Sequence, residues 1–338
     1  MDALKNLKVL ELGHLIASMN HGNGVRLQFN EVATRDGFQM ECHFIETNDK
    51  VALLDALSGL GFAKIEVTSF TSPKAIPALK DAEVVMHRIR RTPGVVYTAL
   101  VPNVRGGERA LACATDEFNL VMSVSATHNL ANLRMTQEQS FSQLQDVIAL
   151  GTQHGVPVNL SLSCVFGCPM EGEIAAEAVL GWIARFAGLG VHGITLCDTT
   201  GMAFPNQVQA LCEAVQARFP KLEFTAHFHN TRGMGLVNAV AAAQAGIRRF
   251  DTSLGGIGGC PYAPGATGNV ATEDMVHMFD CMGYDTGMHL PGLLDAAATL
   301  RRLLRHDLPA QVSQAGPRLT RHAPPADFED IRRRALAR

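Results

Sequence analysis

Charged residues are scarce in this sequence: Asp, Glu, Lys and Arg make up 18% of its 338 residues, against about 25% in an average soluble domain. Hydrophobic residues make up 47%, so much of the chain must be interior and a disordered chain is excluded. The 29 basic and 32 acidic residues leave a net charge of -3. That balance supplies no general field for wrapping nucleic acid or an anionic membrane, so we expect neither as a partner.

The sequence also lacks any uninterrupted apolar run near the ~18 residues that a membrane span needs. Glu11 and His14 lie inside the apolar part of the N-terminal segment, which distinguishes it from a signal peptide. The eight cysteines have no zinc-finger spacing, and without a secretion signal they favour free thiols over a disulfide framework. These absences predict a cytoplasmic protein.

From residue 24 onward, short apolar runs alternate with longer amphipathic stretches, which is typical of β-α units around a parallel sheet. Eight apolar runs predict strands, at residues 25–32, 63–69, 95–101, 118–124, 156–163, 193–197, 223–228 and 249–253. Seven helical patterns lie between them, at residues 50–60, 82–89, 107–112, 137–154, 174–189, 206–219 and 233–245. Eight strands predict an α/β fold of the (β/α)8 barrel type, since a doubly wound sheet more often stops at about five or six.

The domain boundaries follow from where this alternation begins and ends. Thr136 and Gln139 have the spacing of a capping box for the helix at 137–154. A further helix is expected from about Val270, and the alternation stops near Arg305. We therefore expect an N-terminal extension at 1–23, a barrel domain at 24–305 and a C-terminal tail at 306–338 with a short final helix.

Polar residues follow most of the predicted strands, where a barrel of this type places its chemistry. They are residues 31–37 after the first strand, 66–69 in the second, 163–164 at the fifth, 197–201 at the sixth, 227–230 at the seventh and 251–253 at the eighth. Because the carboxyl ends of all eight strands meet at one mouth of the barrel, we expect these side chains to converge.

His227 and His229 are the clearest candidates for a metal site. They are two positions apart on a strand, so both point to the barrel interior. A single buried histidine is more often a hydrogen-bonded structural residue, but a pair near carboxylates predicts a mixed nitrogen and oxygen site for a divalent cation. Oxygen-rich ligation favours Mg2+ or Mn2+ over a structural zinc.

Arg35 and Asp36 directly follow the first predicted strand. Adjacent opposite charges usually form a surface ion pair, but these two stand at the catalytic end of the barrel. That position predicts Asp36 as a metal ligand and Arg35 as the group that neutralises a developing oxyanion.

A glycine-rich loop follows the eighth predicted strand, with six glycines in residues 255–268 and no phosphate-binding motif. We expect a lid that swings over bound substrate, built on Gly255, Gly256, Gly258 and Gly259. Cys260, which stands among these glycines, is a candidate catalytic residue rather than a core residue.

Several of these motifs together resemble the 3-hydroxy-3-methylglutaryl-CoA lyase family, which are metal-dependent acyl-CoA lyases with a TIM barrel. The resemblance runs from about residue 25 to 294. The motifs that carry it are EVATRDGFQ around Asp36, IEVTSFTSPK around Glu66, SCVFGCPMEG from Ser163, CDTTG at Asp198, AHFHN at His227 and His229, and GGIGGCPYAPGATGNVATED from Gly255. The Gly-Gly-Cys-Pro-Tyr-Ala run is the most specific of these.

The resemblance implies cleavage of a 3-hydroxyacyl-CoA into acetyl-CoA and a keto acid, which is acetoacetate for the named substrate. It implies metal ligation by Asp36, His227, His229 and Asn269. It further implies catalysis by Arg35 and Cys260, with Glu66 and Asp198 as acidic helpers. Substrate binding is assigned to Ser69, Ser161 and Glu273. We expect a homo-oligomer with an acyl-CoA substrate.

Three departures from the family pattern leave the acyl group open. Ser161 stands where the family has a tyrosine, Met40 where it has a polar residue, and HFHNTRG includes Asn230 and Arg232 where HDTYG is common. Citramalyl-CoA, which would yield pyruvate, is one alternative substrate, and a synthase of the same barrel group is another reading. A barrel that binds metal but has lost turnover is a third interpretation.

Residues 7–17 also resemble the start of a family III CoA-transferase, in a segment too short to carry that activity.

Overall fold

The structure is a computed structural model that describes residues 24–259 and 268–337. The expected N-terminal extension lies outside the described residues, and so does Cys260 with the part of the glycine-rich loop up to residue 267. Within the described part of the chain, no helix is both long and apolar enough to cross a membrane.

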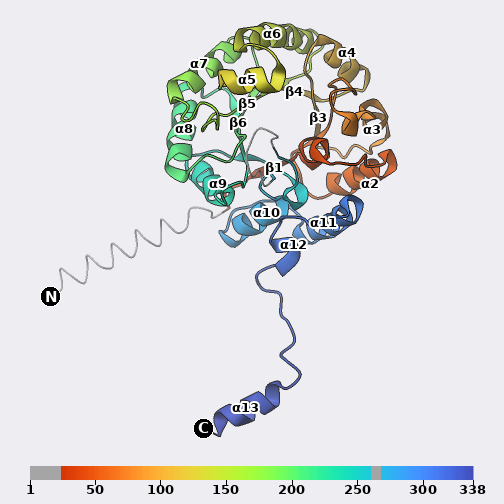
Figure 1. Ribbon diagram of the computed structural model, residues 1–338, viewed down its shortest axis with the longest axis vertical. Coiled ribbons are helices and arrows are strands. Elements are labelled where there is room, and N and C mark those ends of the chain that lie inside the picture. Colours follow the sequence, from red (N-terminus) through yellow and green to blue (C-terminus); the bar gives the residue numbers. More distant parts are fainter. Residues whose placement is uncertain (1–23, 260–267, 338) are drawn as a thin grey trace, which may run out of the picture.

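Eight parallel strands form a closed barrel in sequence order, as the alternation of strands and helices predicts, and β1 pairs with both β2 and β8. The strands are β1 (Gln28–Glu31), β2 (Lys64–Ser69), β3 (Val96–Leu100), β4 (Glu117–Ser123), β5 (Val158–Ser163), β6 (Gly193–Asp198), β7 (Glu223–Phe228) and β8 (Arg249–Thr252). Figure 1 shows the barrel with its helices in an outer ring.

The helices between the strands are α2 (Thr47–Ser58), α3 (Ala82–Arg88), α4 (Val104–Ala112), α5 (Ala126–Leu133), α6 (Gln137–Gln153), α7 (Ala176–Ala187), α8 (Pro205–Arg218) and α9 (Gly235–Gln244). The expected capping box is present: the Thr136 hydroxyl accepts a hydrogen bond from the Gln139 backbone, and the Gln139 side chain accepts one from the Thr136 backbone. Helix α5 is an addition to the predicted set. Its eight residues are too few for a periodic signal, although Ser125 caps its first turn.

The two faces of the strands carry different chemistry. Side chains that face the helices are apolar, such as Phe118 and Leu120 on β4, which are fully buried. Inside the barrel most side chains are polar and many are bonded to one another, where branched aliphatic layers are usual for this fold, although Leu100 and Val121 also face inward at the mouth. Asn159 donates to Asn119 at 3.0 Å, and Lys64 pairs with Glu117. The interior is thus a hydrogen-bonded support beneath the mouth.

The chain continues after β8 through α10 (Thr272–Cys281), α11 (Leu290–Leu304), α12 (Val312–Ala315) and α13 (Phe328–Leu336). The first part of the expected tail packs on the barrel, because Leu308 and Ala310 are buried and Asp274 accepts hydrogen bonds from the backbone of Gln311 and Val312. Beyond it, α13 has no buried residue and lies away from the barrel (Figure 1).

Candidate active site

The chain leaves β1 in a π-helical turn, Ala33–Gly37, in which the amides of both Asp36 and Gly37 point to the Val32 carbonyl. Such turns are rare in proteins, and those that do occur are often found at functional sites. Here the turn brings Arg35 and Asp36 over the barrel mouth, and both side chains are largely buried, with 8% of each residue exposed. The pair is therefore not an ordinary surface ion pair.

Asp36, His227 and His229 meet at one point. Their ligand atoms all lie within 4.8 Å of one another. The Nε2 atoms of the two imidazoles face each other at 3.2 Å. The other ring nitrogen of His227, Nδ1, lies 3.3 Å from a carboxylate oxygen of Asp251. Two ring nitrogens directed at one point beside a carboxylate form the donor set of a divalent cation site.

Two buried atoms of the neighbouring side chains have no partner among the described residues. Asn269 donates through Nδ2 to Asp36 at 2.7 Å and to the Ile257 carbonyl at 3.1 Å, while its buried Oδ1 accepts nothing. The buried Nδ1 of His229 is likewise without a partner. A buried acceptor without a donor is costly, so the free oxygen of Asn269 fits a metal-binding role.

The protonation states of Asp36 and His229 also suit a cation. Burial by itself would raise the pKa of Asp36, but Arg35 and the two histidines lower it, so the carboxylate stays ionised. Burial, with the neighbouring His227, lowers the pKa of His229 to about 3. His229 is therefore a neutral imidazole with a lone pair to donate, which is the form that binds metals.

Arg35 is held by two carboxylates at once. Its Nε donates to Glu66 at 2.6 Å and its Nη1 donates to Asp36 at 2.7 Å. Burial alone would lower the pKa of the Arg35 guanidinium, but Glu66 and Asp36 raise it, so the group is charged at every working pH. Glu66 in turn accepts a hydrogen bond from Asn119 at 2.7 Å, so a chain of contacts fixes the guanidinium in place.

Asp198 ends β6 with one oxygen used and one free. Its Oδ1 accepts hydrogen bonds from the backbone of Met202 at 2.8 Å and Ala203 at 3.1 Å, while its buried Oδ2 has no partner among the described residues. Burial raises the pKa of Asp198 to about 6. A carboxyl with that pKa and a free oxygen is suited to exchange a proton near neutral pH.

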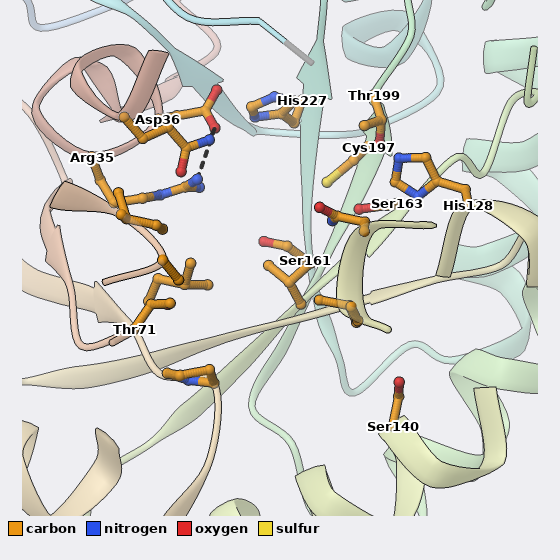
Figure 2. Close-up of a pocket in the computed structure, with 18 of the residues that line it drawn as sticks. Arg35, Asp36, Thr71, His128, Ser140, Ser161, Ser163, Cys197, Thr199 and His227 are labelled. Carbon is orange, nitrogen blue, oxygen red and sulfur yellow. Dashed lines mark hydrogen bonds and ion pairs between the residues drawn. The ribbon is translucent and has the colours of Figure 1, made fainter. Parts of the chain in front are cut away.

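A cavity of about 490 Å³ opens at the mouth beside these residues. Figure 2 shows Arg35 and Asp36 on one side of it and Ser163 and Cys197 on the other, with His227 between them beside Cys197. Ser161 lines the cavity as expected, and its hydroxyl donates to Asn119 at 3.0 Å. Glu66 and Asp198 lie behind the lining rather than in it.

Two residues assigned to substrate binding lie elsewhere. Ser69 is 1% exposed and bonds to Thr71 at 2.8 Å, so Thr71 is the residue that reaches the cavity. Glu273 is fully buried behind the glycine-rich loop, where it accepts a hydrogen bond from the Gly255 backbone at 3.0 Å. The family resemblance implied substrate binding by Glu273, whereas in the structure this residue holds the backbone of the segment that follows β8.

The four glycines expected to move as a lid are packed into the structure. Gly255, Gly256 and Gly258 adopt positive φ, and a Cβ at Gly258 would come within 2.6 Å of the Asn269 amide nitrogen and 3.2 Å of Asp36. Glycine here permits a close approach of backbone to the metal ligands. The segment 255–259 therefore packs against the proposed ligands, with Gly259 in the cavity lining, and Cys260 beyond it lies outside the described residues.

Sequence reasoning missed several residues of the site. Asp251 was one of the polar strand ends but was given no role, although it contacts His227. Helix α5 contributes His128, Asn132 and Leu133 to the cavity. The capping signal at Ser125 could have located this helix. Of the departures from the family pattern, Arg232 donates to the carbonyls of Thr200 and Gly201.

The assembled groups can perform one kind of chemistry well. A divalent cation site binds and polarises substrate oxygens, the buried guanidinium stabilises negative charge, and a carboxyl with a raised pKa exchanges protons. These are the needs of a reaction that passes through an alkoxide and an enolate.

Comparison with known proteins agrees with this chemistry. The family model described as HMGL-like matches residues 26–300. A hydroxymethylglutaryl-CoA lyase of Bacillus subtilis is 43% identical over 286 residues, which are 85% of this chain and 96% of that protein. The (R)-citramalyl-CoA lyase of Chloroflexus aurantiacus is 39% identical over 297 residues, 85% of this chain and 94% of that protein. The structure of an HMG-CoA lyase from Acinetobacter baumannii with coenzyme A and 3-methylmalate is 44% identical, with a TM-score of 0.85 over 90% of this chain and 99% of that one.

Proposed function

The chain belongs to the HMGL-like family and is a carbon–carbon lyase for substrates like 3-hydroxy-3-methylglutaryl-CoA, and we propose that it works with Mg2+ or Mn2+ held by Asp36, His227, His229 and Asn269. The single observation that carries this proposal is the convergence of those three Asp and His ligand atoms within 4.8 Å. The unpartnered oxygen of Asn269 supplies a fourth donor.

The reaction breaks the bond between carbons 2 and 3 of the acyl group. Carbon 3 loses its hydroxyl proton and becomes the ketone of acetoacetate, and the bonding electron pair passes to carbon 2 as the enolate of acetyl-CoA. That carbon then takes up a proton. When bound, the divalent cation would supply the positive charge that polarises substrate oxygens.

The side chains of this protein have separate roles in that scheme. Arg35, fixed between Glu66 and Asp36, faces the cavity and stabilises the negative charge that develops as the bond breaks. Asp198 lies behind the cavity lining and is assigned a supporting role in moving the hydroxyl proton, for which its raised pKa and free oxygen suit it. Cys260 is assigned the proton that the enolate takes up, on the strength of its family motif alone.

Metal removal tests the proposal. After treatment with EDTA and confirmation by elemental analysis, the protein should not cleave 3-hydroxy-3-methylglutaryl-CoA, and Mg2+ or Mn2+ should restore the activity. Cation at about 100 times its Kd should also stabilise the fold by about 2.7 kcal/mol, an effect that His229→Ala should abolish. Full turnover by metal-free protein would disprove the metal-dependent mechanism.

Citramalyl-CoA is the second candidate substrate, favoured by the 39% identity to a citramalyl-CoA lyase. The two substrates give different products, since citramalyl-CoA yields pyruvate where 3-hydroxy-3-methylglutaryl-CoA yields acetoacetate. Offering both thioesters to the Mg2+-loaded protein and measuring both keto acids compares the two kcat/KM values directly. We expect the larger value for 3-hydroxy-3-methylglutaryl-CoA.

A cytoplasmic location and self-association complete the proposal. No disulfide joins two of the cysteines in the described ranges, which is consistent with a reducing compartment. Cell fractionation tests the location, and light scattering of the purified chain tests its oligomeric state.

A further inference from the structure

Three polar side chains lie in one row across neighbouring strands of the barrel. In the register of the sheet, His227 of β7 is the partner of Asp251 on β8, and Asp251 is the partner of Asn30 on β1. Residues that are partners in a register point to the same face of a sheet, so the three side chains lie at one level inside the barrel. All three are largely buried, with 10% of the His227 side chain and 12% of the Asp251 side chain exposed.

Hydrogen bonds join the members of this row. Nδ2 of Asn30 donates to Oδ1 of Asp251 at 2.8 Å, and Oδ2 of Asp251 lies 3.3 Å from Nδ1 of His227. The reverse orientation of the Asn30 amide would place its oxygen against a carboxylate oxygen, so its partner fixes it. An ionised carboxylate only accepts hydrogen bonds, and the proton between Asp251 and His227 therefore belongs to the imidazole, on Nδ1.

The position of this proton decides what the other nitrogen of His227 can do. A neutral imidazole carries one proton, so a proton on Nδ1 leaves a lone pair on Nε2. Nε2 of His227 is the atom that faces the candidate metal site, 3.2 Å from Nε2 of His229. The carboxylate of Asp251 thus selects the form of His227 that can bind a cation.

His229 lacks this kind of support. Its buried Nδ1 has no hydrogen-bond partner in the part of the chain that the structure describes. The two imidazoles of the site therefore differ, and the contact with Asp251 is specific to His227.

We propose that Asp251 is a positioning residue for the cation site: it holds His227 with Nε2 free to bind Mg2+ or Mn2+, and Asn30 fixes the carboxylate that does so. The inference rests on the proposed function, since it takes Nε2 of His227 as a ligand. Asp251 stands outside the group of ligand atoms that lie within 4.8 Å of one another, so it acts through His227. Such partners of a metal-binding histidine affect metal affinity by about 10–100-fold.

Asp251→Asn is a sharp test because Asn30 determines how the new amide turns. Nδ2 of Asn30 needs an acceptor and keeps the oxygen at position 251, so the new NH2 group faces Nδ1 of His227. That nitrogen must then accept, and its proton moves to Nε2, where it blocks the cation. Titration of metal-free protein with Mn2+, followed by the electron paramagnetic resonance signal of free Mn2+, should show a Kd raised at least about tenfold.

Asn30→Leu separates the orientation of His227 from the charge of Asp251. By itself it leaves the carboxylate as an acceptor for His227, so the Kd for Mn2+ should stay within about threefold of the parent, below the range for a lost partner. Combined with Asp251→Asn, it frees the new amide to turn its oxygen to His227. The double variant should therefore bind Mn2+ at least about threefold more tightly than Asp251→Asn alone. Binding that is equal or weaker would mean that only the negative charge matters, and would overturn the inference.

Glu117→Gln is the matched control for loss of a buried carboxylate inside the barrel. Glu117 begins β4, at the opposite end of the strands from the mouth, and pairs with Lys64. This variant should lose stability, because it leaves the Lys64 charge unpaired, and should keep the parent's Kd for Mn2+. A loss of Mn2+ affinity equal to that of Asp251→Asn would contradict a specific role for Asp251.

Nitrogen NMR of the parent reads the proton position directly. In metal-free protein labelled with 15N-histidine, the shifts of Nδ1 and Nε2 show which nitrogen of each imidazole carries the proton, and the signals lost in His227→Gln identify those of His227. The proton should be on Nδ1 in the parent and on Nε2 in Asp251→Asn. A parent with the proton on Nε2 of His227 would refute the inference.

Failure of the inference can be told apart from failure of the function on which it rests. A parent that binds no Mn2+ would refute the proposed function, while the 15N shifts would still decide whether Asp251 holds the proton on Nδ1. A parent that binds Mn2+, with no recovery in the double variant, would leave the function intact and refute the role of Asp251 alone.

Discussion

The position of the Arg35 side chain links the fold to the proposed reaction. It is buried, charged and bonded through two different nitrogens to two carboxylates. A planar guanidinium can make both bonds without moving, whereas the ammonium of lysine is a point charge on a flexible stem. The position of the positive charge, rather than its presence alone, is what the two carboxylates define.

Arg35→Lys should therefore lower kcat by about 10²–10³, the loss typical when one preorganised donor to a developing oxyanion is removed. Steady-state kinetics with saturating substrate and metal measures it. Arg185→Lys is a matched control, because Arg185 also uses two nitrogens on one carboxylate, that of Glu138, but on the surface. A kcat for Arg35→Lys within about threefold of the parent would assign the role to another group.

Gly258 leaves free a space beside the proposed metal ligands that any side chain would fill. Its φ is +106°, and a Cβ there would meet the side chains of Asn269 and Asp36, two proposed ligands. Gly258→Ala should weaken Mn2+ binding at least tenfold, because those two side chains would have to move apart. The affinity can be measured by titration of the metal-free protein.

Gly94→Ala separates this effect from backbone strain. Gly94 also has a positive φ, +88°, but a Cβ there would have nothing within 4 Å. It should lose stability and keep the parent's metal affinity. Equal weakening of Mn2+ binding in both variants would contradict a specific contact at Gly258.

Two buried carboxyls, on β1 and α10, hold the segment that follows β8. Glu31 of β1 accepts from the Leu254 backbone and Glu273 of α10 accepts from the Gly255 backbone. Burial raises the pKa of Glu31 to about 7 and that of Glu273 to about 8. Both carboxyls bind a proton more tightly in the folded chain than in the unfolded chain, so lower pH favours folding.

The sign of the pH effect follows from these values. A carboxyl whose pKa is raised on folding contributes stability below its unfolded pKa, near 4.3 for Glu, and loses that contribution as pH rises through the folded value. The contribution of Glu273 should therefore decline between about pH 4.3 and pH 8. Glu273→Gln, which resembles the protonated carboxyl, should reduce the fall in unfolding free energy over this window.

Urea unfolding at pH 5.5, 7 and 8.5 measures this difference. The parent should lose on the order of 3 kcal/mol more than Glu273→Gln across the series, at about 1.36 kcal/mol for each pH unit between pH 5.5 and the folded pKa. Glu177→Gln, at an exposed position on α7, should behave as the parent does. A Glu273→Gln variant with the parent's pH slope would show that Glu273 is ionised in the folded protein throughout.

For the whole molecule, the barrel and the final helix are energetically separate. Residues 321–337 are exposed, and α13 buries none of its side chains. Removing residues 324–338 should leave Tm within about 2 °C of the parent, because surface segments without buried contacts contribute little to stability. Calorimetry measures it, and a fall of 5 °C or more would mean that the segment packs against the barrel in solution.

Much of this architecture was predictable because it depends on local periodicity. Apolar runs of strand length alternating with amphipathic stretches predict eight β-α units, and closure into a barrel then places every strand end at one mouth. For that reason Asp36, which follows the first strand, could be expected beside His227 and His229 at the end of the seventh. Their mutual distance confirms that they converge.

The tertiary structure decided what local patterns do not encode. The side to which Glu273 turns, the packing of Gly255 and Gly258 against distant side chains, and the cavity beneath α5 all depend on elements that lie far apart in the sequence. Periodicity specifies which face of an element is buried, but contact between two elements depends on their separation and on the volumes of the side chains between them. The residues of the candidate metal site follow from strand order, whereas the shape of the cavity beside it follows from packing alone.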